Sequence, residues 1–318
     1  MSILDFSTKD NLDKGSPPWE GEPPNLKVLT LEEIREARKK RLISTMICVY
    51  GDESHDELEQ RVYAVAGLMG TQEEWDRVKL IWVARTGEKP FHAVDCESDQ
   101  GDYRGLPHED NQKLYVDLLN ILAESAIEGY GMDLEIGAYR AYHGGNFQHL
   151  HCFEKVVRHF CDRGINLNKK VKFTFHTNLK IEADATSLYH LMVNSDETKL
   201  STCMDDEVSF ASNKKVEIQV ACLWARECMK HVDNLIGPKY RETRISMQVL
   251  LDTGRFECAV LPKKYWKDFR IAIMKKGNHH GGLNPDDYKK WRIAHRLVDN
   301  TRNKIRYINF LESLKMKP

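Results

Sequence analysis

The stretch that most constrains the fold of this chain is an apolar run that ends in charged and hydroxyl residues, Thr45-Met46-Ile47-Cys48-Val49-Tyr50-Gly51-Asp52-Glu53-Ser54. A short apolar run suits a buried strand, but unpaired charge is costly in a protein interior. We therefore predict a central strand whose last residues reach the edge of the sheet, where the acids meet solvent, a metal ion or a substrate. A strand that simply ends in a polar turn is the alternative.

The rest of the chain alternates between strand-like and helix-like segments. Apolar or alternating segments predict further strands at 62–69, 132–142, 171–175 and 208–210, the first of them as the hairpin partner of the opening strand. Periodic apolar positions predict helices at 71–82, 109–128, 146–162, 183–192 and 216–232, and Trp75, Val78, Ile81 and Trp82 are the residues that the first helix would bury. This order is typical of an α/β protein with helices on the faces of a mixed sheet.

The chain divides into three predicted parts. An extended, proline-containing arm covers residues 1–29, the α/β domain covers 30–236, and a C-terminal extension covers 237–318. Within the extension we expect a hairpin over 245–261. Basic amphipathic helices are expected after it, at 265–275 and 286–314.

Composition limits the classes of function and location. The net charge of the 318 residues is -1, so nucleic acid could bind only through a local basic patch. No run of 18 apolar residues exists and the first 25 residues lack the apolar segment of a signal peptide, which predicts a cytoplasmic protein with no membrane partner. The eight cysteines form no CxxC pair, and reduced thiols are expected. Nucleic acid, a protein partner and a second copy of the chain remain open as partners.

The acidic residues predict a metal-dependent reaction. Two-metal catalysis needs several carboxylates around ions about 3.5–4 Å apart, and oxygen ligands suit Mg²⁺ or Mn²⁺. Asp52, Asp95 and Glu97 are the predicted metal ligands. Neighbouring strand residues face opposite sides, so we expect Asp52 to point to the site and Glu53 away from it. The predicted catalytic set is Asp52, Glu53, His92 and Asp95, with His92 orienting a ligand or leaving group.

Three blocks of the sequence, in order, resemble the domain of unknown function 3800 family. The first block is Tyr50-Gly51-Asp52-Glu53-Ser54, and the second is Phe91-His92-Ala93-Val94-Asp95-Cys96-Glu97 followed by Gly101 and Tyr103. The third runs from Val208-Ser209-Phe210 to Ser212 and continues as Ile218-Gln219-Val220-Ala221-Cys222-Leu223-Trp224-Ala225-Arg226-Glu227. The resemblance covers roughly residues 45–235. It implies a ribonuclease-H-like fold and a metal-dependent nuclease or a relative of one.

The sequence departs from this family pattern at two positions. Cys222 stands where the third block usually has an acid, and His176 ends a strand that often ends in an acid. A thiol is a poor ligand for a hard cation. Helical spacing places Gln219, Cys222 and Arg226 on one stripe. We expect Gln219 and Arg226, together with Ser54, to contact a substrate, Arg226 through a phosphate.

These residues leave two functions open. One is a metal-dependent nuclease or phosphodiester hydrolase that uses Mg²⁺ or Mn²⁺. The other is a catalytically degenerate relative that binds nucleic acid or a protein. Two further alternatives are a nucleophilic Cys222 with His176 as its base, and a zinc site at His143, His149 and His151; a buried, space-filling Cys222 is the simpler interpretation.

Overall fold

The computed structural model describes most of residues 46–261. Within that range it leaves out Glu57, Glu88 and residues 144–146, 179–180, 195–197 and 238–239, together with the side chains of 142–143 and 198–199. The predicted N-terminal arm and the predicted helices at 265–275 and 286–314 lie outside the described residues.

The described residues form an α/β domain around a six-stranded mixed sheet with the order β5-β4-β1-β2-β3-β6. The strands are β1 Met46–His55, β2 Val62–Thr71, β3 Glu128–Glu135, β4 Lys170–His176, β5 Ser209–Ala211 and β6 Phe256–Leu261. β1, β2 and β3 are antiparallel in chain order. β4 is parallel to β1, β5 to β4, and β6 to β3. The predicted hairpin of the first two strands is confirmed.

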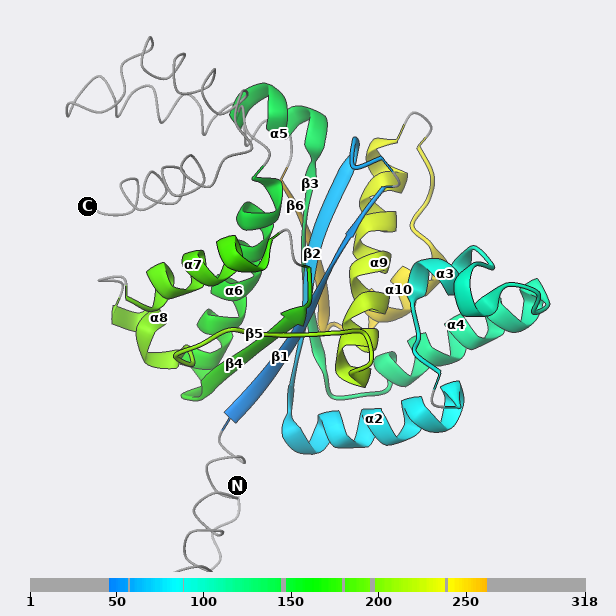
Figure 1. Ribbon diagram of the computed structural model, residues 1–318, viewed down its shortest axis with the longest axis horizontal. Coiled ribbons are helices and arrows are strands. Elements are labelled where there is room, and N and C mark those ends of the chain that lie inside the picture. Colours follow the sequence, from blue (N-terminus) through cyan, green and yellow to red (C-terminus); the bar gives the residue numbers. More distant parts are fainter. Residues whose placement is uncertain are drawn as a thin grey trace, which may run out of the picture. The chain divides into compact units, whose positions relative to one another are not determined.

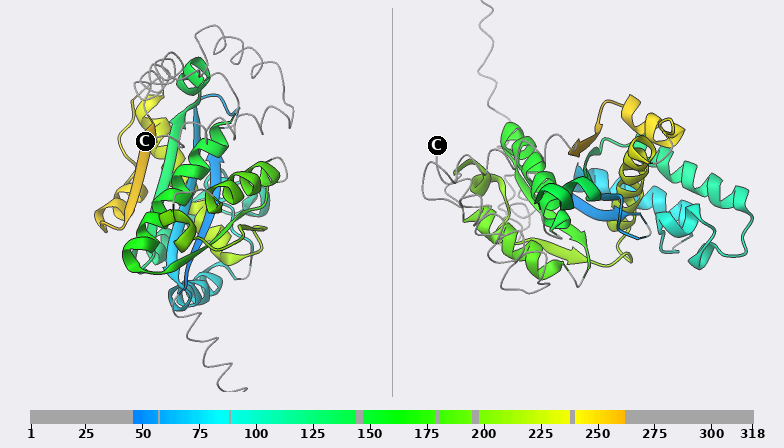
Figure 2. Two further views of the ribbon diagram at one scale, coloured as in Figure 1. Left: turned by 90° about the vertical axis from the view of Figure 1, so that its left-hand side faces the viewer. Right: turned by 90° about the horizontal axis from the view of Figure 1, so that it is seen from above.

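Helices cover both faces of the sheet, as Figures 1 and 2 show. The helices on one side are α6 Gln148–Leu167, α7 Glu182–Val193 and α8 Thr198–Cys203. The helices on the other side are α2 Gln72–Thr86, α3 Ala93–Glu97, α4 His108–Ala123, α9 Val216–Ile236 and α10 Ile245–Asp252. α5 Ile136–His143 follows directly from β3, and η1 Gly101–Tyr103 is a short 3₁₀ turn. β1 lies between the two helical layers, which is why its sequence is apolar on both faces.

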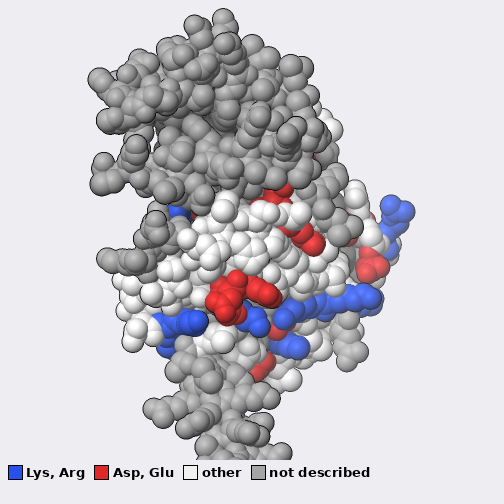
Figure 3. Space-filling view, turned by 60° about the vertical axis from the view of Figure 1, so that its left-hand side comes forward, with Lys and Arg blue, Asp and Glu red and all other residues white. Residues whose placement is uncertain are grey.

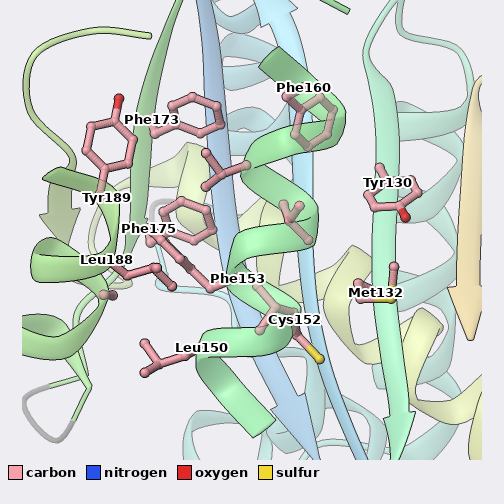
Figure 4. Packing of buried hydrophobic residues seen from close by; sticks show 14 of the residues in the cluster. Tyr130, Met132, Leu150, Cys152, Phe153, Phe160, Phe173, Phe175, Leu188 and Tyr189 are labelled. Carbon is pink, nitrogen blue, oxygen red and sulfur yellow. The ribbon is translucent and has the colours of Figure 1, made fainter. Parts of the chain in front are cut away.

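The apolar residues form one large cluster on each face of the sheet. Ile47 and Val49 of β1 point toward α6, and Cys48 and Tyr50 point toward α9. On the α6 side, Figure 4 shows a group of aromatic rings from α6, β4 and α7, among them Phe153, Phe173, Phe175 and Tyr189. The ring centroids of Phe153 and Phe175 are 4.8 Å apart. Together with the parallel pairing of β4 and β1, this aromatic packing places the ends of the two strands side by side.

Most predicted helices are present, with small shifts at their ends. The N-cap of α2 is as predicted, because the Thr71 hydroxyl accepts a hydrogen bond from the backbone N–H of Glu74. Trp75, Val78 and Trp82 are buried as predicted. Ile81 is not: it is 39% exposed on the outer side of the helix.

Two predicted elements are wrong in type or extent. The strand predicted at 132–142 is β3, which begins at Glu128 and ends at Glu135, and the residues after it form α5. The hairpin predicted at 245–261 is instead a helix, α10, followed by β6. Met247 and Leu250, three residues apart, are the buried residues of α10. Because β6 pairs with β3, the predicted domain end at residue 236 excludes a strand of the same sheet.

Candidate functional site

Asp52 lies near the end of β1, on the face that α9 covers, and is buried. Its Oδ1 accepts a hydrogen bond of 2.8 Å from the backbone N–H of Glu53 and lies 3.1 Å from Nδ1 of His176. The parallel register pairs Gly51 with Phe175, which places the next residue of each strand side by side. The hydrogen bond to Asp52 raises the pKa of His176 above its ordinary value, although burial of the ring acts in the opposite direction. The side chains of Asp52 and His176 therefore form a pair at the ends of two parallel strands.

Cys222 reaches the same place from α9. Burial, and then the charge of Asp52, raise the pKa of its thiol well above the ordinary value, and the backbone of Ala93 forms a hydrogen bond with it. Asp52, His176 and Cys222 thus bring β1, β4 and α9 together at one end of the sheet. The uncharged thiol suits the space-filling interpretation of Cys222, because a nucleophilic cysteine needs a lowered pKa.

Glu53 points to the opposite face of the sheet, as strand alternation predicts. The Tyr63 hydroxyl and the Asn178 side-chain amide donate hydrogen bonds to its carboxylate. Burial raises the pKa of Glu53 above its ordinary value in spite of these two donors. Ser54, the next residue, is buried. Glu53 is therefore held away from Cys222 and α9.

A narrow pocket lies beside the ends of β1 and β4. Asp52, Glu53 and His176 line it together with His149 and with the apolar side chains of Val65, Phe153, Phe175, Ile181, Ala185 and Phe210. Its volume is about 30 Å³. A cavity of this size holds only one or two water molecules, so the pocket as it stands is too small for a nucleotide.

The second acidic block forms a different set of contacts on α3. Nδ1 of His92 lies 3.0 Å from Oδ2 of Asp95, and both side chains are partly exposed. Glu97 faces two arginines: Arg226 on α9 at 2.7 Å and Arg244, before α10, at 2.8 Å. Burial by itself would raise the pKa of Glu97, but the charges of Arg226 and Arg244 outweigh it and lower the pKa. Arg226 thus binds a carboxylate of its own chain, where a phosphate contact was predicted.

The predicted metal ligands do not form a compact ligand set. Among the described residues, the one group of three or more ligand atoms that all lie within 4.8 Å of one another consists of Asp133, Cys228 and Cys258, and it includes none of Asp52, Asp95 and Glu97. The groups next to Asp52 are an imidazole and a thiol, and two guanidinium groups already neutralise Glu97. Mg²⁺ and Mn²⁺ prefer oxygen ligands. The residues present at this site therefore do not fit a pair of these ions.

The remaining predicted residues have structural contacts. The side-chain oxygen of Gln219 accepts from Trp82 Nε1 at 3.1 Å, and its amide nitrogen donates to the backbone carbonyl of Asn213 at 2.9 Å. Both ends of this buried amide are therefore used within the protein. His149 and His151 are buried on α6 and belong to no compact ligand group among the described residues.

Sequence reasoning missed a buried polar network next to Glu97. Glu227 of α9 is completely buried, and it accepts hydrogen bonds of 2.7 Å each from the Tyr115 hydroxyl and the Ser246 hydroxyl. Arg244 lies 3.7 Å from the same carboxylate while it pairs with Glu97. A charged residue in a helix whose apolar residues cover most of its circumference was the available signal, because buried charges are paired. Its partners could not be read from the sequence, since they come from α4 and from the segment around α10.

Basic side chains lie on the α9 side of the sheet, beside Cys48 and Tyr50 of β1. Lys172, which is exposed, and His176, which is partly exposed, lie on this side of β4. Nζ of Lys215 lies 4.8 Å above the ring of Tyr50. Glu217 and Asp76 act on the same region, because their charges, like those of Lys172 and Lys215, affect the pKa of Cys48. On the opposite side of the sheet, where Figure 3 looks, blue and red side chains lie next to one another. Lysines and acids lie together on the α9 side as well.

Comparison of the chain with protein families and with curated proteins identifies no relative. None of the protein-family models matches the chain, and no curated protein is similar to it. Among the described helices, none has both the length and the apolar character needed to cross a bilayer.

Proposed function

We propose that this protein is a ribonuclease-H-like module that binds single-stranded nucleic acid and lacks a two-metal catalytic centre. The observation that carries the proposal is the pairing of Asp52 with His176, at the position where the sequence resemblance implies a second carboxylate. On the α9 side of the strand ends, the neighbours of Asp52 are therefore one imidazole and one buried thiol, while Glu53 faces the other side. Such a site lacks the negative charge that holds two hard cations.

The fold assignment is supported by the arrangement of the sheet. Three consecutive antiparallel strands, β1 to β3, are followed by β4 and β5, which add parallel strands on the other side of β1. The three blocks of the resemblance lie on β1, around α3, and on β5 and α9. Asp52 and Cys222, from the first and third blocks, meet at one end of the sheet.

Binding of nucleic acid is supported by the cations on the α9 side of the sheet. Lys172 and Lys215 both lie on this side, with Nζ of Lys215 4.8 Å above the ring of Tyr50, and the charges of both act on Cys48. His176 adds no cation of its own, because it pairs with Asp52. Contacts of this kind attract phosphates without reading sequence. Because Glu217 and Asp76 act on the same region and offset the two lysines, we expect weak binding that decreases steeply as salt increases.

The test is a fluorescence-anisotropy titration of labelled single-stranded RNA and DNA, performed with Mg²⁺ and with a chelator. We expect the same affinity in both conditions and no cleavage products. The charge reversal Lys172→Glu should weaken binding by about threefold or more, because a phosphate contact becomes a repulsion. Lys113→Glu is the matched control, since Lys113 is exposed on α4; it should leave affinity unchanged.

Two outcomes would contradict the proposal. Mg²⁺-dependent cleavage that is lost in Asp52→Asn would identify a nuclease, and calorimetry would then detect Mg²⁺ binding to the unaltered protein but not to this variant. If the protein bound neither RNA nor DNA at low salt, the proposed binding of nucleic acid would be wrong. Binding to a protein partner would then be the remaining function for a catalytically degenerate module.

A further inference from the structure

A second cluster of chemically reactive groups lies on the α9 side of the sheet, between β3, β6 and α9. It contains Asp133, Cys228 and Cys258, and one ligand atom of each residue lies within 4.8 Å of the other two. None of these residues belongs to the site around Asp52. Three groups from three elements far apart in the chain meet here, which a short sequence motif could not reveal.

The backbone makes room for this cluster at Gly131. β6 pairs with β3 so that Cys258 lies opposite Gly131, two residues before Asp133 on the same face. A Cβ atom at Gly131 would lie only 2.4 Å from Sγ of Cys228. The absence of a side chain at this position therefore lets the thiol of α9 approach the sheet closely, beside Cys258 and Asp133.

Asp133 is a buried carboxylate with an unsatisfied oxygen. The residue has no exposed surface, and its Oδ2 accepts a hydrogen bond of 3.0 Å from Sγ of Cys258. Its Oδ1 is buried and has no hydrogen-bond partner among the described residues. Burial raises the pKa of Asp133 to about 7. A carboxylate in these surroundings needs either a proton or a cation, because an uncompensated buried charge is strongly unfavourable.

We propose that Asp133, Cys228 and Cys258 bind one zinc ion. Two thiolates and one carboxylate are ligands that Zn²⁺ accepts in tetrahedral sites, whereas hard cations avoid thiolates. Zinc bonds of about 2.0–2.3 Å separate ligand atoms by roughly 3.5 Å, so the three side chains need to move only slightly inward.

Binding changes the protonation of the ligands and leaves one position open. The two thiols lose their protons to solvent as the two Zn–S bonds form, and a protonated Asp133 loses its proton as the Zn–O bond forms. The fourth position is open to water or to an external ligand. Cys258 is the one partly exposed residue of the three, so access is expected from its side. The ion would connect the last strand of the sheet to α9.

The test is titration of the reduced, metal-free full chain with Co²⁺ and then with Zn²⁺. We expect one equivalent of Co²⁺ to produce thiolate-to-metal charge-transfer absorption, and Zn²⁺ to abolish it. Cys258→Ser and Asp133→Asn should each weaken Zn²⁺ binding by about tenfold or more. Cys96→Ser is the matched control, because Cys96 is a buried free thiol on α3 outside the cluster; its affinity should equal that of the unaltered protein.

A second measurement does not depend on the folding of any variant. X-ray absorption at the zinc edge of the loaded, unaltered protein should show two sulfur atoms and at least one oxygen atom around the ion. A shell without sulfur, a lack of the cobalt charge-transfer band, or equal zinc affinity in the folded Cys258→Ser variant would each overturn the proposal.

Discussion

His176 determines the chemistry at the ends of β1 and β4, because its imidazole is the group that pairs with Asp52. An acid there would repel Asp52, so that the two carboxylates would need a cation between them. The imidazole instead forms a hydrogen bond with Asp52, which raises the pKa of the imidazole. An imidazole at this position thus pairs with Asp52 without a cation between them.

The raised pKa of His176 predicts a pH dependence of stability. A histidine whose pKa is higher in the folded state stabilises that state fully below its unfolded pKa, about 6.5. The stabilisation is lost as pH rises through the folded pKa. Urea unfolding over a series of pH values should therefore show the unaltered protein losing stability relative to His176→Gln as pH rises from below 6.5. If the free energies of unfolding of the two proteins changed with pH in parallel, Asp52 would not favour the protonated form of His176.

Gly131 is a second residue with a testable structural role. In Gly131→Ala the new methyl group would overlap Sγ of Cys228, and we expect a loss of about 1–3 kcal/mol in the free energy of unfolding. Gly137→Ala on α5 is the control, because a Cβ there meets no atom closer than 4.0 Å. The denaturant concentrations at the midpoints of unfolding give the stability of both variants. The double variant Gly131→Ala/Cys228→Ala should recover part of the loss; if it does not, the overlap with the thiol is not the cause.

At the scale of single elements, α9 organises the charged groups beside the sheet. Its residues Cys222, Arg226 and Glu227 reach Asp52, Glu97 and Tyr115, respectively. Burial of nearly the whole helix leaves each of these polar groups dependent on a particular partner. Stability should therefore respond strongly to changes of the polar residues of α9.

Glu227 is the most sensitive of these positions. Removing its carboxylate in Glu227→Ala leaves the Tyr115 and Ser246 hydroxyls without their acceptor and Arg244 with one acidic partner fewer. Loss of one partner from a buried charged group costs about 3–5 kcal/mol. Glu73→Ala, on the exposed first turn of α2, should change stability by less than about 0.5 kcal/mol. Equal urea midpoints for the two variants would contradict the proposed network.

The elements differ in how far the sequence could predict them. The apolar runs of β1 and β2 are strand-length, and α9 is long enough that helix was the better interpretation of its apolar residues. Residues 245–249 alternate apolar and polar side chains, which favours a strand, so the sequence predicts a strand where the structure has α10. Strand alternation predicted the opposite orientations of Asp52 and Glu53. The ion pair of Glu97 with Arg244 could not be predicted, because it depends on tertiary packing of residues 147 positions apart.

At the scale of the whole molecule, the sheet extends beyond the region covered by the sequence resemblance. β6 and α10 complete the α9 side, where the rings of Phe256 and Trp224 lie 5.2 Å apart and Leu250 is buried. A division of the chain at residue 236 would expose these apolar contacts and the edge of β3. We infer that residues 237–261 are part of the folded domain and not an addition to it.

Truncation tests this inference. A chain that ends at residue 236 should lack cooperative thermal unfolding and bind hydrophobic dyes, because it has lost β6 and the packing of α10. A chain that ends at residue 261 keeps both elements and should unfold cooperatively. If both chains melt in the same sharp transition, β6 is dispensable.

The parallel pairing of β6 with β3 has a consequence during synthesis. β6 begins about 120 residues after β3 ends, so the ribosome adds those residues before the edge of β3 can find its neighbour. At translation rates of about 5–20 residues per second, this interval lasts roughly 6–24 s. For that time a nascent chain carries an unpaired strand edge, to which a chaperone or a neighbouring nascent chain could bind.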